Sequence, residues 1–192
     1  MSPQDDGTLF PRHYRLPDGS EPRVLDVLRI WLHRARPEPH QPENHVVSAR
    51  PWQRVARRAE TVAGLLAAAI DARPLILGTT GDRIPYSAAA ASPLEASLAL
   101  VRPREAVFVS TRSYSGNPQA RLRFRHGGSG YYLSVTDPVW ELEIAGRREG
   151  EYRPRELGLD ERRLLVTVSL GEPFNGDCYK LIAAIFEAPA PL

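Results

Sequence analysis

Arginine and tyrosine side chains recur at alternate positions in the second half of the chain, where they could hold a nucleic acid. Arg121, Arg123 and Arg125 lie two residues apart, so they would share one face of a β-strand. Guanidinium groups bind phosphates and aromatic rings stack on bases, so tyrosines nearby would complete such a surface. We therefore predict a nucleic-acid-binding site made of Arg112, Tyr114, Arg121, Arg123, Arg125, Tyr132 and Lys180. The alternative is a solvated sheet face whose arginines pair with nearby acids.

A second group of polar side chains lies in the segment GEPFNGDCYK. Glu172, Asn175 and Asp177 follow an expected strand, and loops at strand ends often carry functional groups on a rigid scaffold. Turn chemistry alone also explains Asn-Gly and Asp at such positions. The string TDP offers the same choice, because Asp137, after Thr136, could bind a ligand or cap the element that follows.

No other residues form a metal-binding or catalytic motif. His40, Glu43 and His45 are too constrained by prolines to make a convincing metal site, and one cysteine excludes a cysteine-based zinc site. The string GTTGDR lacks the lysine of a phosphate-binding loop, and GxSxG, HExxH and CxxC are absent from the sequence. Cys178 lies in an apolar run, which predicts a buried and inert thiol. We expect no metal, no cofactor and no catalytic residues.

The amino-acid composition indicates the class of protein but says little about the binding partner. With 42% hydrophobic and 25% charged residues, the chain is typical of a globular protein. The net charge is only +2, and Lys180 is the single lysine, a bias that a GC-rich genome explains as well as phosphate binding does. The lone cysteine is typical of a reducing compartment, and neither a signal peptide nor an 18-residue apolar run is present. These features predict a cytoplasmic protein that does not enter a membrane.

The first half of the chain mixes several patterns. Prolines and glycine in residues 1–22 predict an extended arm, and the near-continuous apolar run that follows, to residue 32, predicts a strand buried on both faces. Three prolines in residues 35–42 predict a connecting loop. From Pro51 to residue 73, apolar residues at helical spacing predict one or two helices, and residues 75–93 have no clear pattern.

The second half alternates polar and apolar residues with period two. Strands are predicted in 97–103 and 105–114, then in a hairpin of ARLRFR and YYLSVT joined by HGGSG. VWELEIAG fits a helix or a strand, and a polar insertion follows it. RRLLVTVSLGEPF and CYKLIAAIF predict a last strand pair, after which the proline-containing tail at 189–192 cannot continue a sheet.

Three strings resemble one protein family. SVTDP at 134–138, VSLGEPFNGDCYKLIAAIF at 168–186 and, more loosely, RVLDVLRIWLHRARPEPHQPENHVV at 23–47 are similar to the dual OB-containing domain proteins of prokaryotes. The resemblance implies two OB-type β-barrels in tandem and a role in sensing nucleic acid or nucleotides in conflict (defence) systems. It implies no catalytic residues.

Together these observations predict a mainly β protein of two OB-like antiparallel barrels. The first would occupy residues 23–95, with a helical insert, and the second residues 96–188. The expected function is non-catalytic binding or sensing of nucleic acid or a nucleotide. Two alternatives remain open: an adaptor that recognises a protein partner through the arginine-rich hairpin, and a small hydrolase that uses Glu172 and Asp177 as a carboxylate pair.

Overall fold

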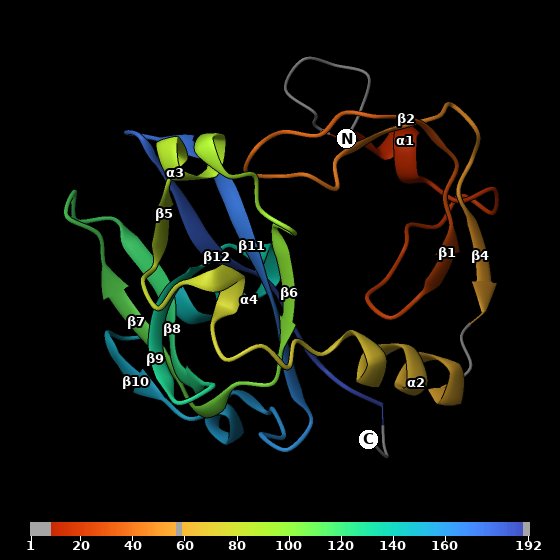
Figure 1. Ribbon diagram of the computed structural model, residues 1–192. Helices are drawn as coiled ribbons and strands as arrows, with labels where there is room; N and C mark the ends of the chain where they lie inside the picture. Colours follow the sequence, from red (N-terminus) through yellow and green to blue (C-terminus); the bar gives the residue numbers. More distant parts are fainter. Residues whose placement is uncertain (1–8, 57–58, 190–192) are drawn as a thin grey trace.

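The prediction of a mainly β protein is confirmed by the computed structural model, which describes residues 9–56 and 59–189. Most of the β-structure lies in one large sheet, formed mainly by the second half of the chain with one strand from residues 83–85. Figure 1 shows this sheet beside a smaller group of elements from the first half, which contains α1, β1, β2, β4 and α2. The two groups differ in strand length and in how deeply their side chains are buried.

Two short antiparallel ribbons make up the β-structure of the first half. β1 (Val27–Arg29) pairs with β4 (Gln53–Ala56), and β2 (Leu32–Ala35) pairs with β3 (His45–Val47). The single buried strand predicted before residue 32 is therefore wrong, because the run is split into β1 and β2, and every residue of β2 is exposed. Ribbons of this size can bury few side chains.

The start of the chain is more ordered than the prediction of an extended arm. A short helix, α1 (Pro11–Tyr14), lies inside the predicted arm, and Leu16 is buried just after it. The first eight residues of the predicted arm lie outside the described residues. Proline also begins helices, where its fixed φ angle is favourable, so Pro11 begins α1 within this proline-rich segment.

One helix occupies part of the segment in which helices were expected. α2 spans Ala59–Ala69 and buries Val62, whereas residues nearer Pro51 form β4 instead of a helical turn. Pairing with β1 decides the conformation of β4, which the helical spacing of the sequence could not indicate. In the described part of the chain, no helix combines the length and the apolar character that crossing a membrane requires.

An eight-stranded sheet forms the main body of the protein. Its strands are β5 (Arg83–Pro85), β6 (Leu98–Val101), β7 (Arg104–Arg112), β8 (Pro118–His126), β9 (Ser129–Val135), β10 (Gly150–Tyr152), β11 (Leu164–Phe174) and β12 (Asp177–Glu187). Their order is β10-β7-β8-β9-β12-β11-β6, with β5 also paired to β12. The β9–β12 pair is parallel, so the prediction of antiparallel pairing throughout is wrong there. The described strands form an open order from β10 to β6, and the two predicted barrels are not found closed.

The arginine-rich hairpin folds as predicted, with a shorter turn. β8 and β9 are antiparallel and continue to His126 and Ser129, so only Gly127 and Gly128 connect them. Both glycines have positive φ angles of 54° and 86°, which a tight two-residue turn requires. The inward side chains of the hairpin, such as Leu122, are buried in the main core.

Short helices occupy the segments whose pattern was ambiguous or absent. VWELEIAG belongs to α4 (Pro138–Ala145), and residues 75–93 contain η1 (Ile76–Gly78) and α3 (Tyr86–Ala91) as well as β5. The polar insertion contains β10 and η2 (Pro154–Leu157). Asp137 caps α4, because its Oδ1 accepts hydrogen bonds from the backbone N–H groups of Val139 and Trp140 at 3.0 and 3.2 Å.

The proline-rich loop of the first half packs against the main sheet through polar contacts. The Glu43 carboxylate accepts hydrogen bonds from the backbone N–H of Ser97 at 3.0 Å and from its hydroxyl at 2.7 Å. The Gln41 amide donates to the Leu170 carbonyl oxygen at 3.2 Å. The loop predicted as a simple connection therefore fastens the two regions together.

Candidate functional site

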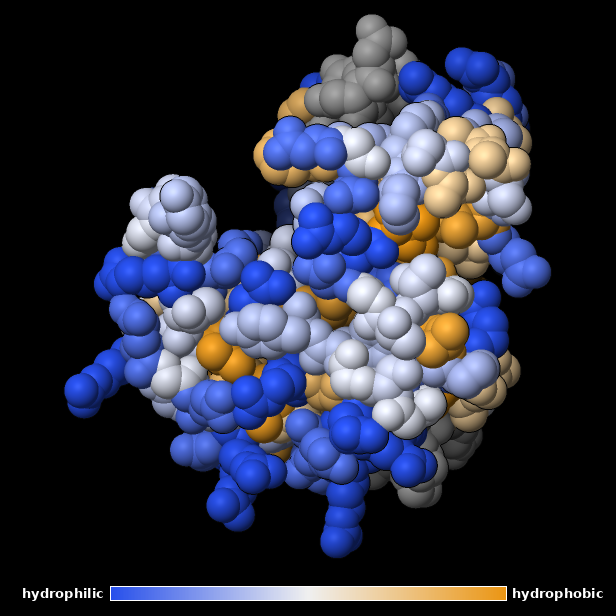
Figure 2. All heavy atoms as spheres, turned by 60° about the vertical axis from the view of Figure 1, so that its left-hand side comes forward, coloured by the Kyte–Doolittle hydropathy of each residue, from blue (hydrophilic) through white to orange (hydrophobic). Residues whose placement is uncertain are grey.

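The three arginines of β8 share the outer face of the main sheet. Their side chains alternate with those of Ala120, Leu122 and Phe124, which point into the core and are at most 1% exposed. Period-two patterning therefore gave the correct orientation for Arg121, Arg123 and Arg125. In Figure 2, the side of the molecule that carries β7, β8 and β10 comes forward, and hydrophilic residues cover most of it, with small separate hydrophobic areas.

Arg121 and Tyr132 form the part of this face best suited to a nucleic acid. The Arg121 guanidinium carbon lies 4.3 Å from the centre of the Tyr132 ring, and Nη2 donates to the Tyr132 carbonyl oxygen at 2.9 Å. Arg121 Nε is buried and has no hydrogen-bond partner among the described residues. A cation stacked on an exposed ring offers a phosphate contact and a base platform at one position.

Two of the predicted arginines are paired with carboxylates. Arg123 donates from Nη1 and Nη2 to the two oxygens of Glu151, each at 2.8 Å, and Arg112 Nε lies 2.7 Å from Glu149 Oε1. The Arg123 hydrogen bonds lower the pKa of Glu151 and raise that of Arg123, so both groups stay charged. The alternative of arginines paired with nearby acids therefore applies to Arg112 and Arg123. The sequence could not name Glu149 and Glu151 as those acids, because β10, which carries Glu151, lies beside β7 only in the folded sheet.

Arg125 and Tyr114 lie at opposite ends of the hairpin's strand β8. Arg125 Nη2 donates to the carbonyl oxygen of Gly128 at 2.7 Å, next to the two-glycine turn. Tyr114 lies in the connection between β7 and β8 and is fully exposed. The face therefore runs along β8 from an exposed ring to an arginine at the hairpin turn.

Lys180 is not part of this exposed face, because it is only 1% exposed. Its ammonium group donates to the Thr79 carbonyl oxygen and to the Thr79 hydroxyl, both at 2.7 Å, and lies 5.4 Å from the centre of the Tyr131 ring. Burial lowers the pKa of Lys180 to about 8, and the charge of Asp82 opposes that shift. The sequence placed Lys180 near polar turn residues, but β12 directs it inward.

The loop candidates do not converge on one site. Glu172 Oε2 lies 3.0 Å from Nε2 of the buried His40, whereas Asp177 Oδ2 lies 3.3 Å from Arg83 Nη1. Asn175 occupies the turn between β11 and β12, where its φ angle of 51° matches the tolerance of asparagine for this conformation. The carboxylate pair of the hydrolase alternative is thus divided between two partners. Among residues 9–56 and 59–189, no cluster of three or more His, Cys, Asp or Glu side chains is arranged to hold a metal ion.

Five further charged residues near the hairpin turn were not identified from the sequence. They line a hollow together with Arg125, and they are Asp71, Arg73, Arg102, Arg104 and Glu105. Their only signal was the basic string Arg-Pro-Arg at 102–104, which reads as a simple link between strands. Tertiary structure brings this link to the hairpin turn.

Comparison with known proteins identifies a family but no individual relative. The model of the family described as dual OB-containing domain matches residues 1–185. Neither the curated proteins nor the solved structures include a significant match. The match extends over almost the whole chain and agrees with the three strings that suggested the family. The chain therefore belongs to the dual OB-containing domain family.

Proposed function

We propose that this protein binds single-stranded nucleic acid or a nucleotide along the outer face of β8 and β9, without catalysing a reaction. The observation that carries the proposal is the Arg121 guanidinium stacked on the exposed Tyr132 ring at 4.3 Å. Arg125 extends the positive charge of this pair along the same strand face. Arginine for the phosphates and an aromatic ring for the bases is the combination that single strands require.

The ion pairs on this face are weak enough for a phosphate to replace their carboxylates. Arg123 and Glu151 are both about half exposed, at 51% and 55%, and an exposed pair of this kind contributes only about 0 to 1 kcal/mol. A phosphate could therefore replace Glu151 as the partner of Arg123 at little cost. Glu149 and Glu151 would also reduce unspecific binding of polyanions, since their negative charges repel any polyanion.

The experiment measures binding of a labelled single-stranded oligonucleotide by fluorescence anisotropy across a range of salt concentrations. We expect log K to fall with log salt concentration by about 0.7 for each phosphate neutralised. The double variant Arg121→Glu/Arg123→Glu should weaken binding strongly, and Tyr132→Ala should weaken it while leaving the salt slope unchanged. Arg155→Glu, an exposed arginine of η2, is the control for changed net charge.

Two outcomes would contradict the proposal. The first is binding without salt dependence, or binding that the double variant leaves unchanged. The second is recovery of one protein partner after nuclease treatment, in an interaction that the same double variant abolishes. That second result would support the adaptor alternative.

A further inference from the structure

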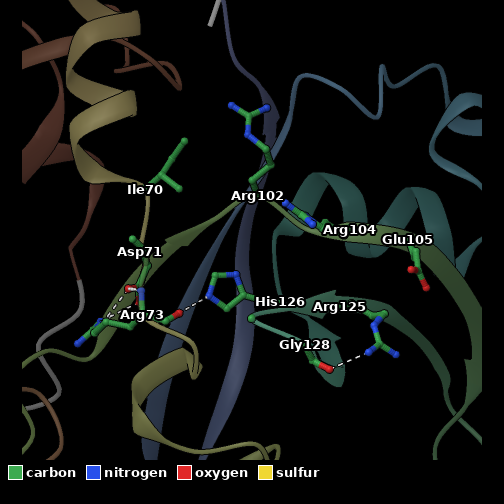
Figure 3. A pocket seen from close by; sticks show the side chains of 11 residues that line it. Ile70, Asp71, Arg73, Arg102, Arg104, Glu105, Arg125, His126 and Gly128 are labelled. Atoms are coloured by element: carbon green, nitrogen blue, oxygen red, sulfur yellow. Dashed lines mark hydrogen bonds and ion pairs between the residues drawn. The ribbon is translucent and has the colours of Figure 1, made fainter.

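A positively charged hollow lies at the turn of the β8–β9 hairpin, separate from the Arg121–Tyr132 pair. Its volume is about 430 Å³, within the range of pockets that bind small ligands. Figure 3 shows that three stretches of chain supply its lining: the segment after α2, the chain from Arg102 into the start of β7, and the end of β8 with the hairpin turn. The charged lining residues are Asp71, Arg73, Arg102, Arg104, Glu105 and Arg125.

Positive charge exceeds negative charge in this hollow. Asp71 is already bound by Arg73, which donates from Nε and Nη2 to its two carboxylate oxygens, each at 2.8 Å. With that pair set aside, Arg102, Arg104 and Arg125 share the lining with one carboxylate, that of Glu105. Arg102 Nη1 donates to the Arg162 carbonyl oxygen at 2.5 Å, and Arg125 Nη2 donates to that of Gly128 at 2.7 Å, so each keeps other N–H groups for a ligand. Although the backbone of Arg104 pairs with β8, its side chain has no hydrogen bond or ion pair with any described residue. Its guanidinium donors are available to a ligand.

Two of these arginines are held opposite one another by the sheet. Arg104 of β7 and Arg125 of β8 are direct cross-strand partners in the register of the sheet. Like charges placed directly opposite each other destabilise a sheet unless a counter-charge lies between them. An anion bound in the hollow would remove this repulsion, so the pairing itself indicates a negatively charged ligand.

The backbone beside these arginines is irregular. The register of β7 against β8 shifts between Arg104 and Val107, and Glu105 has a φ angle of 52°, which is uncommon for a residue other than glycine. A bulge of this kind changes the direction of side chains and occurs often beside functional sites. Here it separates Arg104 from the regular strand and turns this residue and Glu105 toward the hollow.

The walls of the hollow are fixed before any ligand binds. A Cβ atom on Gly127 would lie 2.0 Å from the Pro74 carbonyl oxygen, so the hairpin turn packs directly on the segment after α2. His126 Nε2 donates to the Arg73 carbonyl oxygen at 2.7 Å, and the Asp71 N–H donates to the Leu100 carbonyl oxygen at 2.7 Å. A preformed site loses little conformational entropy on binding.

We propose that this hollow binds a terminal phosphate group, at the end of a nucleic-acid strand or of a nucleotide. A terminal phosphate carries close to two negative charges and three acceptor oxygens, which match the charge and donors of three guanidinium groups. A phosphate within a strand carries one charge and needs a groove that is open at both ends. The choice of a nucleic-acid ligand rests on the proposed function. The two sites share Arg125, but Arg102 and Arg104 belong to the phosphate site and take no part in the β8–β9 face.

The test compares internally labelled single strands with a phosphate at the 5′ end, with a phosphate at the 3′ end, or with none. We expect one phosphorylated strand to bind about tenfold more tightly than the unphosphorylated strand. Arg104→Gln should abolish this preference without lowering the unfolding midpoint, because the side chain is exposed and unpaired among the described residues. Arg155→Gln, with the same change in charge, should leave the preference intact.

Competition of ATP and of inorganic phosphate with the labelled strands distinguishes the possible sources of the bound phosphate group. If ATP competes with the strands and Arg104→Gln removes this competition, the ligand is a free nucleotide, even when the three strands bind equally well. Equal binding of the three strands together with no competition would overturn the proposal. The double variant Arg121→Glu/Arg123→Glu separates this result from the proposed function, because it should weaken all three strands equally and preserve the preference for a phosphate.

Discussion

The ribbons of the first half and the sheet of the second half are both β-structure, but different forces hold them. The sheet alternates buried and exposed residues over strands of up to eleven residues, and its inward side chains form one continuous core. The ribbons have three or four residues per strand; β3 buries Val46 and Val47, but every residue of β2 is exposed. The comparison shows that the sheet is stabilised by its own apolar packing, whereas the ribbons depend on contacts such as that of Glu43 with Ser97.

The largest expected effect comes from removing a core ring of the sheet. Phe108 is fully buried and stacks on Trp140, with ring centres 6.2 Å apart, so Phe108→Ala should lower the free energy of unfolding by about 3 to 5 kcal/mol. The matched change in the ribbons, Val55→Ala, removes a half-exposed side chain of β4 and should cost less than about 0.5 kcal/mol. Urea denaturation measures both values. Equal losses would show that the ribbons have a core of comparable strength.

The next effect concerns the only lysine, which lies within the core of the sheet. The pKa of Lys180 is about 8 in the folded protein and near 10.5 when the chain is unfolded, so between these pH values the unfolded chain binds a proton that the folded protein has lost. The free energy of unfolding should therefore rise with pH across this window, by about 3 kcal/mol.

The test compares the free energy of unfolding of the unchanged protein and of the Lys180→Met variant by denaturation. The measurements run between pH 7.5 and 10.5, roughly the window set by the lysine pKa. The contribution of the Cys178 thiol, whose pKa is raised by burial, is common to both proteins and cancels in the difference. The variant should show a flatter dependence on pH. The same slope in both proteins would mean that the ammonium group is hydrated in the folded state.

A smaller effect tests the polar attachment of the first half. Glu43→Ala removes the acceptor for the N–H and hydroxyl of the buried Ser97, and should lower stability by about 1 to 3 kcal/mol. Amide hydrogen exchange should become faster at Ser97 and in β3, while β11 and β12 remain protected. Glu38→Ala, in the same loop, is the control. Faster exchange throughout the main sheet would contradict the view that it is stable by itself.

The smallest effect on stability is expected on the outer surface of the sheet. Glu151→Gln removes the charge that pairs with Arg123, and should change stability by less than about 1 kcal/mol, because the pair is exposed. The same variant should bind single strands more tightly, with a salt slope larger by about 0.7. Glu161→Gln is the control for the charge change. A large loss of stability would show that the sheet depends on its surface ion pairs as the ribbons depend on Glu43.

Local patterns predicted the second half well and the first half poorly. Alternation of arginine with leucine and phenylalanine was enough to place Arg121, Arg123 and Arg125 on one face, because side-chain direction in a strand depends on the strand alone. In the first half, sequence periodicity predicted one strand where the structure has β1 and β2, and a helix where it has β4. Strands this short take their conformation from their partners, which sequence patterns do not reveal.

The sequence by itself determined the mainly β character, the hairpin of β8 and β9 with its three arginines on one face, and the family. Only the tertiary structure decided that Glu151 neutralises Arg123, that Lys180 is buried, and that Arg104 meets Arg125 beside Arg73. The physical reason is distance along the chain. Strand faces are set by neighbouring residues, whereas ion pairs, buried contacts and hollows join residues far apart in the sequence, such as Arg123 with Glu151 at 28 positions and Lys180 with Thr79 at 101, which only sheet order and packing bring together.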